Sequence, residues 1–146
     1  MSAACPLCQV VERIARGEHP SFIAELEESH AILGDNQGTI GWVTLILKEH
    51  ADHLDMLPLE RQCRLFADVA RVAHAQREIF GPVRINYECL GNVVAHVHWH
   101  AIPRHANDPT PNATVWGWTP EQFKGRASDA ERADLIRRIR TALGIR

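Results

Sequence analysis

Long apolar runs are absent from this sequence. No stretch approaches the roughly 20 consecutive apolar residues that cross a bilayer. Residues 1–10 also lack the basic start and the long apolar middle of a secretory signal peptide. We therefore expect a cytoplasmic protein that has no membrane partner.

An excess of charge of either sign is also missing, since 16 Lys and Arg residues meet 18 Asp and Glu residues, for a net charge of -2. A protein that binds DNA or RNA needs a concentrated basic face. The arginines between residues 126 and 146 do not supply one, because Asp129, Glu131 and Asp134 lie among them and indicate a solvated helix face. We expect no nucleic-acid polymer as a partner.

Cysteine is scarce, with four residues in the chain, and a reducing compartment argues against disulfides. Cys63 and Cys89 stand in periodic apolar segments, where we expect ordinary core thiols. Cys5 and Cys8 differ, because Cys-X-X-Cys spacing suits a tetrahedral zinc ion when two further nitrogen or sulfur ligands complete the set. On its own the pair is also compatible with two reduced thiols that bind no metal.

The length and apolar content suit one domain, because 146 residues that are 45% hydrophobic can bury a single core. Periodicity and turn signals predict an α+β fold. Helices are predicted at 7–16, at 58–80 and from Ser128 to Gly144, the last with a capping box of Ser128 and Glu131. Strands are predicted near 22–25, 30–33, 41–47, 83–89 and 93–102, with a turn at 34–38 and a loop at 105–119.

Residues 96–101 read His-Val-His-Trp-His-Ala, an alternation of imidazoles with apolar side chains. In a strand, the two-residue period puts His96, His98 and His100 on one face. Two valines before the segment and Pro103 after it favour a strand that ends there. Three imidazoles on one face suit either a metal site or a phosphate-handling nucleophile with its helpers.

This segment resembles the signature of the histidine triad superfamily of nucleotide hydrolases and transferases. Further motifs of that superfamily follow in order along the chain: Cys5-Pro6-Leu7-Cys8, Lys48-Glu49-His50, Leu57-Pro58, Ile85-Asn86 and Leu90-Gly91-Asn92. The triad with Pro103-Arg104 behind it is similar to a bacterial branch described as diadenosine tetraphosphate hydrolase-like. The resemblance covers about residues 5–107, and a loop and helix at 108–146 complete a single domain of residues 1–146.

The resemblance implies a five-stranded antiparallel sheet with packed helices, paired across a two-fold axis into a homodimer. The strands predicted from the sequence give the same count. The predicted helix at 58–80 carries an apolar stripe of Leu59, Cys63, Phe66, Ala70 and Ala73. We expect Leu59, Phe66 and Ala73 to leave enough apolar surface for both the core and a partner subunit.

The resemblance also implies a reaction. His98 attacks the α-phosphorus of a nucleotide substrate and forms a nucleotidyl-histidine, which water then hydrolyses. The backbone carbonyl of His96 fixes the tautomer of His98, and His100 stabilises charge on the phosphate. A histidine rather than a glutamine at position 100 favours a hydrolase over a transferase. Dinucleoside polyphosphates and nucleoside phosphoramidates both present the required phosphorus, and the sequence does not choose between them.

Five further residues are implied in substrate binding. Asn86 positions the phosphate and the histidines, while Gly91 and Asn92 approach the leaving phosphate, with Asn92 in place of the Gln or Ser of relatives. Asp35 and Asn36 fall in the loop that binds ribose hydroxyls. Asn86 is also compatible with the role of an ordinary strand or turn residue, and Asp35 with that of a turn-forming residue.

In relatives with a Cys-X-X-Cys pair, the first triad histidine and a histidine at the end of the central strand complete a zinc site. The resemblance thus implies a structural zinc held by Cys5, Cys8, His50 and His96 and closed to water. The remaining histidines lack such spacing and are expected at the surface: His19, His30, His53, His74 and His105.

Two other classes of function stay open on the sequence. In the first, the triad histidines hold a catalytic metal, as in a metallohydrolase. In the second, the domain is a nucleotide sensor or interaction module without turnover.

Overall fold

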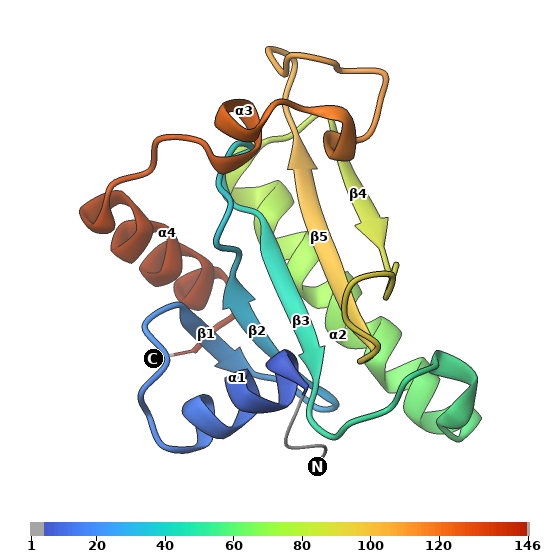
Figure 1. Ribbon diagram of the computed structural model, residues 1–146. Coiled ribbons are helices and arrows are strands. Elements are labelled where there is room, and N and C mark those ends of the chain that lie inside the picture. The colour runs from blue at the N-terminus through green and yellow to red at the C-terminus, as the bar shows by residue number, and fades with distance from the viewer. Residues whose placement is uncertain (1–4, 146) are drawn as a thin grey trace.

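A five-stranded antiparallel sheet organises the computed structural model, which describes residues 5–145 (Figure 1). The strand order is β1-β2-β3-β5-β4, so β1 and β4 form the two edges. The strands are β1 (Phe22–Glu25), β2 (Ser29–Leu33), β3 (Val43–Leu47), β4 (Arg84–Glu88) and β5 (His98–Arg104). The α-helices are α1 (Pro6–Ala15), α2 (Leu59–Phe80), α3 (Pro120–Lys124) and α4 (Asp129–Ala142), with short 3-10 turns η1 (Leu54–Met56) and η2 (Val115–Gly117).

The predicted α+β class and the five-stranded antiparallel sheet are confirmed. Residues 1–4 and 146 of the predicted domain lie outside the described residues. Between residues 5 and 145, no helix is long and apolar enough to cross a membrane.

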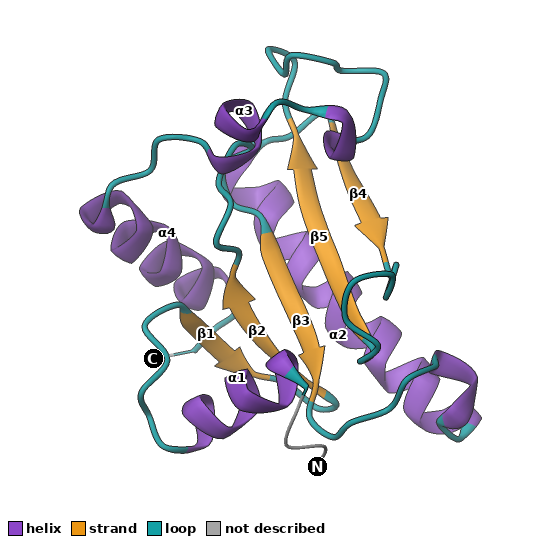
Figure 2. Cartoon of the chain, in the orientation of Figure 1, coloured by secondary structure: helices purple, strands orange, loops and turns teal. Residues whose placement is uncertain are grey.

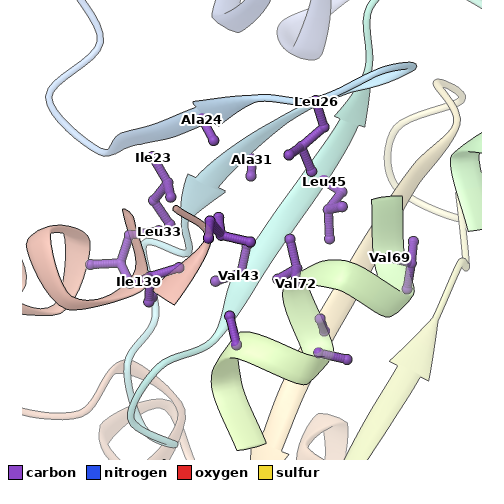
Figure 3. Close-up of a cluster of buried hydrophobic side chains, with 14 of the residues drawn as sticks. Ile23, Ala24, Leu26, Ala31, Leu33, Val43, Leu45, Val69, Val72 and Ile139 are labelled. Atoms are coloured by element: carbon purple, nitrogen blue, oxygen red, sulfur yellow. The ribbon is translucent and has the colours of Figure 1, made fainter. Parts of the chain in front are cut away.

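The two faces of the sheet differ in chemistry, because successive side chains of a strand point to opposite sides. One face is apolar and packs against α2 and α4, and Figure 2 shows α2 behind the sheet and α1 in front of it. In Figure 3, Leu33, Val43 and Leu45 from the strands meet Val72 of α2 and Ile139 of α4. The other face carries His98 and His100 of β5.

The apolar stripe predicted for α2 was assigned to the wrong face of the helix. Leu59, Cys63, Phe66 and Ala70 are exposed, and the helix buries a neighbouring stripe instead. Of the predicted stripe only Ala73 is buried; the observed buried face consists of Leu65, Asp68, Val69, Val72, Ala73, Ala75 and Gln76. The prediction of core thiols fails as well, since both Cys63 and Cys89 are exposed.

Two buried polar side chains of α2 explain this error. The Asp68 carboxylate accepts hydrogen bonds from the Glu28 backbone N–H at 2.9 Å and from the Ser29 hydroxyl at 2.8 Å. The Gln76 amide donates to the backbone carbonyls of Gly41 at 2.8 Å and Ala101 at 2.9 Å. Both residues read as solvent-facing in a sequence, yet here they satisfy buried backbone groups at the helix-sheet contact.

Strand β5 differs from its prediction at both ends. It begins at His98, while residues 89–97 form a loop in which Val93 is 96% exposed. It also continues through Pro103, because pairing with β3 ends at Ala101 and only β4 accompanies the strand beyond that point. His96 therefore precedes the strand, and the expectation that it shares one strand face with His98 and His100 is wrong.

The capping signals near the C-terminus have mixed outcomes. Ser128 and Glu131 form the predicted capping box at the start of α4. A second box, of Thr119 and Gln122, begins α3, which the sequence analysis did not predict. A helix of five residues leaves too little periodicity to be found without its cap.

The role of Gln76 predicts a stability defect. Gln76→Met keeps the volume but leaves the two buried carbonyls without their donor, so the free energy of unfolding should fall by about 1–3 kcal/mol. His74→Met on the exposed side of the same helix is the control and should change it by less than about 0.5 kcal/mol. Urea unfolding measures both. Equal stabilities for the two variants would contradict the structural role.

Candidate active site

A pocket of about 530 Å³ opens on the histidine face of the sheet. Its volume lies in the range of about 300–1,000 Å³ that is usual for small-molecule sites. Its walls combine apolar side chains of α1 and β2, a polar loop, the two strand imidazoles and three aromatic rings: Leu7, Val10, Ile32, Asp35, Asn36, His98, His100, Trp42, Trp116 and Phe123. Such a mixture suits a ligand with both an apolar and a polar part.

The orientation of His98 is set by His96, which lies just before β5. Its Nδ1 lies 2.5 Å from the backbone carbonyl oxygen of His96. Because a carbonyl only accepts hydrogen bonds, Nδ1 carries the proton, and neutral His98 has its lone pair on Nε2. Within residues 5–145 no hydrogen bond to that Nε2 is found, and the ring lines the pocket. The geometry presents an unengaged imidazole nitrogen to a ligand.

His100 lies beside His98 and contacts two tryptophan rings. The ring centroids of the two imidazoles are 5.1 Å apart. Trp42 and Trp116 pack edge-on against His100, each with a centroid separation of 5.5 Å. Burial, and to a lesser extent the charge of His98, lowers the pKa of His100 to about 4. His100 is therefore uncharged at neutral pH.

Gly41 explains how Trp42 reaches His100. The φ angle of Gly41 is 88°, in the left-handed region that favours glycine, and a Cβ at this position would collide with the Phe80 ring. The chain therefore turns at Gly41 as β3 begins. Trp42 then enters the pocket wall, 3% exposed, with its indole N–H toward His100 Nδ1 at 3.2 Å.

A second cluster lies at the entry to β5, where Cys5, Cys8, His50 and His96 converge with their ligand atoms all within 4.8 Å of one another. For tetrahedral Zn²⁺, usual bond lengths predict sulfur-nitrogen separations of about 3.6 Å and nitrogen-nitrogen separations of about 3.4 Å. Three of the four sulfur-nitrogen separations are 3.5, 3.5 and 3.7 Å, and the two Nδ1 atoms are 3.4 Å apart. The four residues fit a tetrahedral zinc ion.

The far sides of both imidazoles support this arrangement. His96 Nε2 lies 2.9 Å from the backbone carbonyl oxygen of Leu47, and His50 Nε2 lies 2.9 Å from the Asp52 carboxylate. Acceptors on Nε2 fix the proton there and leave Nδ1 as the ligand atom, which is the usual support of a metal-binding histidine. The ring of His96 thus belongs to this cluster. Within residues 5–145 the three triad histidines form no metal cluster of their own.

The substrate-binding residues predicted from the sequence separate into two groups. Asp35, Asn36, Gly91 and Asn92 line the pocket. Asn86 does not, because its side-chain oxygen accepts a hydrogen bond of 2.8 Å from Arg104 and the residue is absent from the pocket wall.

Arg104, which stood in the family motif without a predicted role, holds the loop that follows β5. It is 3% exposed, and its guanidinium pairs with the Asp108 carboxylate at 2.7 Å. It also donates to the carbonyls of Thr110 at 3.0 Å and Ala113 at 2.7 Å. This anchored loop leads into η2, which places Trp116 over His100.

His19 is a further pocket residue that the sequence did not indicate, and the expectation of a surface position is wrong for it. It lines the wall near Asp35. Burial and the Arg13 cation lower the pKa of His19, while the Asp35 carboxylate opposes them. No motif marks His19, Trp42 or Trp116, because each reaches the pocket through tertiary structure.

Comparisons with known proteins agree with this architecture. The HIT domain family model matches residues 16–107, which is more than half of the chain. The protein called Protein hit from Bacillus subtilis is 29% identical over 126 residues, or 82% of this chain and 83% of that protein. A histidine triad protein from Bradyrhizobium japonicum has a similar fold, with a TM-score of 0.76 at 23% identity over 90% of this chain and 94% of that one.

A Zn-bound histidine triad family protein from Mycobacterium smegmatis is also similar. Its TM-score is 0.70 at 26% identity, over 99% of this chain and 96% of that chain. The likeness therefore extends over both the pocket and the Cys/His cluster.

The pKa of His100 predicts a pH dependence of stability. Between about pH 4 and 6.5 the unfolded chain binds a proton at His100 that the folded protein does not, so this residue makes the free energy of unfolding fall as the pH falls through that window. His100→Gln cannot titrate and should remove this part of the slope. Urea unfolding of both proteins across the window measures the difference. Identical slopes would contradict an uncharged, buried His100.

Proposed function

Because the chain belongs to the HIT domain family, we propose that it is a nucleotide hydrolase that uses His98 as its nucleophile. The observation that carries this proposal is the geometry of His98, whose Nδ1 is held by the His96 carbonyl while Nε2 borders the pocket without a partner among the described residues. A nucleophilic imidazole needs one occupied and one available nitrogen.

The reaction has two displacement steps. His98 Nε2 attacks the α-phosphorus of the nucleotide, and the bond from that phosphorus to the leaving group breaks. The positive charge that develops on the imidazole is accommodated by the short hydrogen bond from Nδ1–H to the His96 carbonyl. Water then attacks the phosphorus of the nucleotidyl-histidine, which releases a nucleoside monophosphate and restores His98.

The rest of the pocket supports a nucleotide as the substrate. Leu7, Val10 and Ile32 provide an apolar surface for a base, and the Asp35 carboxylate accepts hydrogen bonds from ribose hydroxyls. Asn92 also lines the pocket, and its side-chain amide is suited to donate to the leaving group. We assign dinucleoside polyphosphates or nucleoside phosphoramidates as the substrate class. A domain that only senses nucleotides would share these contacts but show no turnover.

The nucleophile predicts a large catalytic defect. His98→Ala should lower kcat by about 10³-fold or more while nucleotide binding stays measurable. Turnover of diadenosine tetraphosphate and of an adenosine phosphoramidate, measured side by side, tests this, and His74→Ala on the exposed side of α2 is the control. Activity of His98→Ala within tenfold of the unmodified protein would rule out the covalent mechanism. Partial rescue of His98→Gly by added imidazole would support it independently.

We further propose that Cys5, Cys8, His50 and His96 hold a structural zinc ion. A site with four protein ligands has no open position for water, so the ion would stabilise the fold and orient His96 without taking part in hydrolysis. The separations of the ligand atoms and the zinc bound to the similar protein from Mycobacterium smegmatis support this assignment.

The zinc proposal predicts about one zinc ion per chain in freshly purified protein, because closed thiolate sites hold zinc tightly at neutral pH. Cys8→Ser should lose the metal and lower the stability, and its kcat should fall less than that of His98→Ala. Cys63→Ser, which changes an exposed thiol away from the cluster, should keep its zinc. Elemental analysis gives the content, and full zinc in Cys8→Ser would refute the assignment.

We also propose that the protein is a homodimer. β4 is an edge strand with free pairing capacity, and the outer side of α2 exposes apolar side chains, with Leu59 71% and Phe66 49% exposed. A two-fold contact that joins these surfaces would bury them.

Light scattering should therefore give twice the chain mass of 16.4 kDa at micromolar concentration. Phe66→Arg should shift the protein toward monomer, because it places a charge in the proposed contact. Ile40→Arg, at an exposed apolar residue outside α2 and β4, should not. A monomeric unmodified protein would contradict the proposal.

A further inference from the structure

The hydrogen bond between Trp42 and His100 defines which nitrogen of His100 carries the proton. The Trp42 indole Nε1 lies 3.2 Å from His100 Nδ1, and Trp42 is 3% exposed. An indole N–H donates and never accepts, so His100 Nδ1 must be the acceptor. The proton of neutral His100 therefore resides on Nε2.

Thr44 also approaches this nitrogen but does not decide its state. The Thr44 hydroxyl lies 3.4 Å from His100 Nδ1. A hydroxyl both donates and accepts, so Thr44 is compatible with either tautomer. Only Trp42 discriminates between them.

We propose that Trp42 is a positioning residue that locks His100 as an uncharged hydrogen-bond donor with its proton on Nε2. The proposed role of His100 toward phosphate rests on the function proposed above, whereas the lock itself is a property of the folded protein.

The locked form of His100 is favoured because a second proton, on Nδ1, would disturb the hydrogen bond from Trp42. A proton on Nδ1 would break the hydrogen bond from Trp42 and leave a buried indole N–H without an acceptor, which is unfavourable for a buried donor. Burial of His100 opposes the charge in the same direction. Both effects keep the imidazole neutral.

The charged groups around His100 decide what a bound phosphate would meet. Among the described residues, the pocket wall includes no Lys or Arg side chain. The titratable groups that face His100 are His98 on the same strand and Glu88, which lies opposite it on β4 and accepts a hydrogen bond from Trp116. Asp35 and His19 stand farther along the wall. A phosphate in this pocket would therefore meet neutral donors.

A neutral donor beside the nucleophile has a chemical advantage. Attack by His98 makes its imidazole cationic, and a second cation on a ring whose centroid lies 5.1 Å away would oppose that change. An Nε2–H donor stabilises the charge on the phosphate oxygens without this repulsion. Neutral imidazole is an established electrophile of this kind in enzymes.

Nuclear magnetic resonance of the unmodified protein is the first test. Two-bond correlations between the carbon-bound imidazole protons and the ring nitrogens distinguish the tautomers. We expect His100 at neutral pH as a single form with its proton on Nε2. A form with the proton on Nδ1, or a doubly protonated ring, would overturn the proposal, and this measurement does not depend on any variant.

The second test compares Trp42→Phe with Thr44→Val. Trp42→Phe removes the indole N–H, so His100 should show a population with its proton on Nδ1 and should take up a second proton at a higher pH. Thr44→Val removes the group that does not discriminate and should leave the tautomer unchanged. A pure Nε2–H form in Trp42→Phe, or a loss of that form in Thr44→Val, would overturn the assignment to Trp42.

Kinetic measurements then distinguish the tautomer of His100 from its effect on the proposed reaction. If the hydrolase function holds, Trp42→Phe should lower kcat by about tenfold with KM changed by less than about threefold, because the lost alignment matters most in the transition state. A change in KM alone would overturn the catalytic consequence. An unmodified protein that hydrolyses no nucleotide would refute the proposed function, while the tautomer measurement would still decide the lock.

Discussion

His96 commits every one of its polar groups, and both chemical centres of the molecule depend on it. Its ring places Nδ1 in the Cys/His cluster and Nε2 against the Leu47 carbonyl. Its backbone carbonyl holds His98, and its backbone N–H donates to Val94 at 2.9 Å. A rotation of this residue would move the Nδ1 atom of the Cys/His cluster and the carbonyl that fixes the tautomer of His98 together. The cluster and the His98 imidazole are therefore coupled through one residue.

The sequence predicted those features that local rules determine. The five strands, the capping box of α4 and the convergence of the Cys-X-X-Cys pair with two distant histidines all follow from spacing or from family motifs. The buried face of α2 was predicted wrongly because Asp68 and Gln76 are polar residues, which a sequence pattern places in solvent. Their burial is explained only by hydrogen bonds to backbone groups of other elements. The start of β5 was misplaced for a related reason, since β-branched residues in the loop before it satisfy the same pattern as a strand.

Several residues of the pocket wall could not be predicted from sequence motifs. Trp42 and Trp116 have no characteristic spacing, and each contacts His100, which lies elsewhere in the chain. Trp42 needs Gly41 to enter the wall, and Trp116 needs the loop that Arg104 anchors. Such positions become visible only when the partners are placed in space. The imidazoles were visible beforehand because one short segment contains all three.

The loop that Arg104 anchors leads to a part of the pocket wall that lies outside the family match. That match spans residues 16–107 and includes His98 and His100, whereas Trp116 and Phe123 of the wall follow it. One side of the pocket is therefore built from a segment that the matched family domain does not contain. Changes of sequence in that segment would alter the wall beside His100 but leave the hydrogen bonds of His98 to His96 and of Trp42 to His100 in place. The shape of the pocket can in this way vary on one side while the two imidazoles keep their partners.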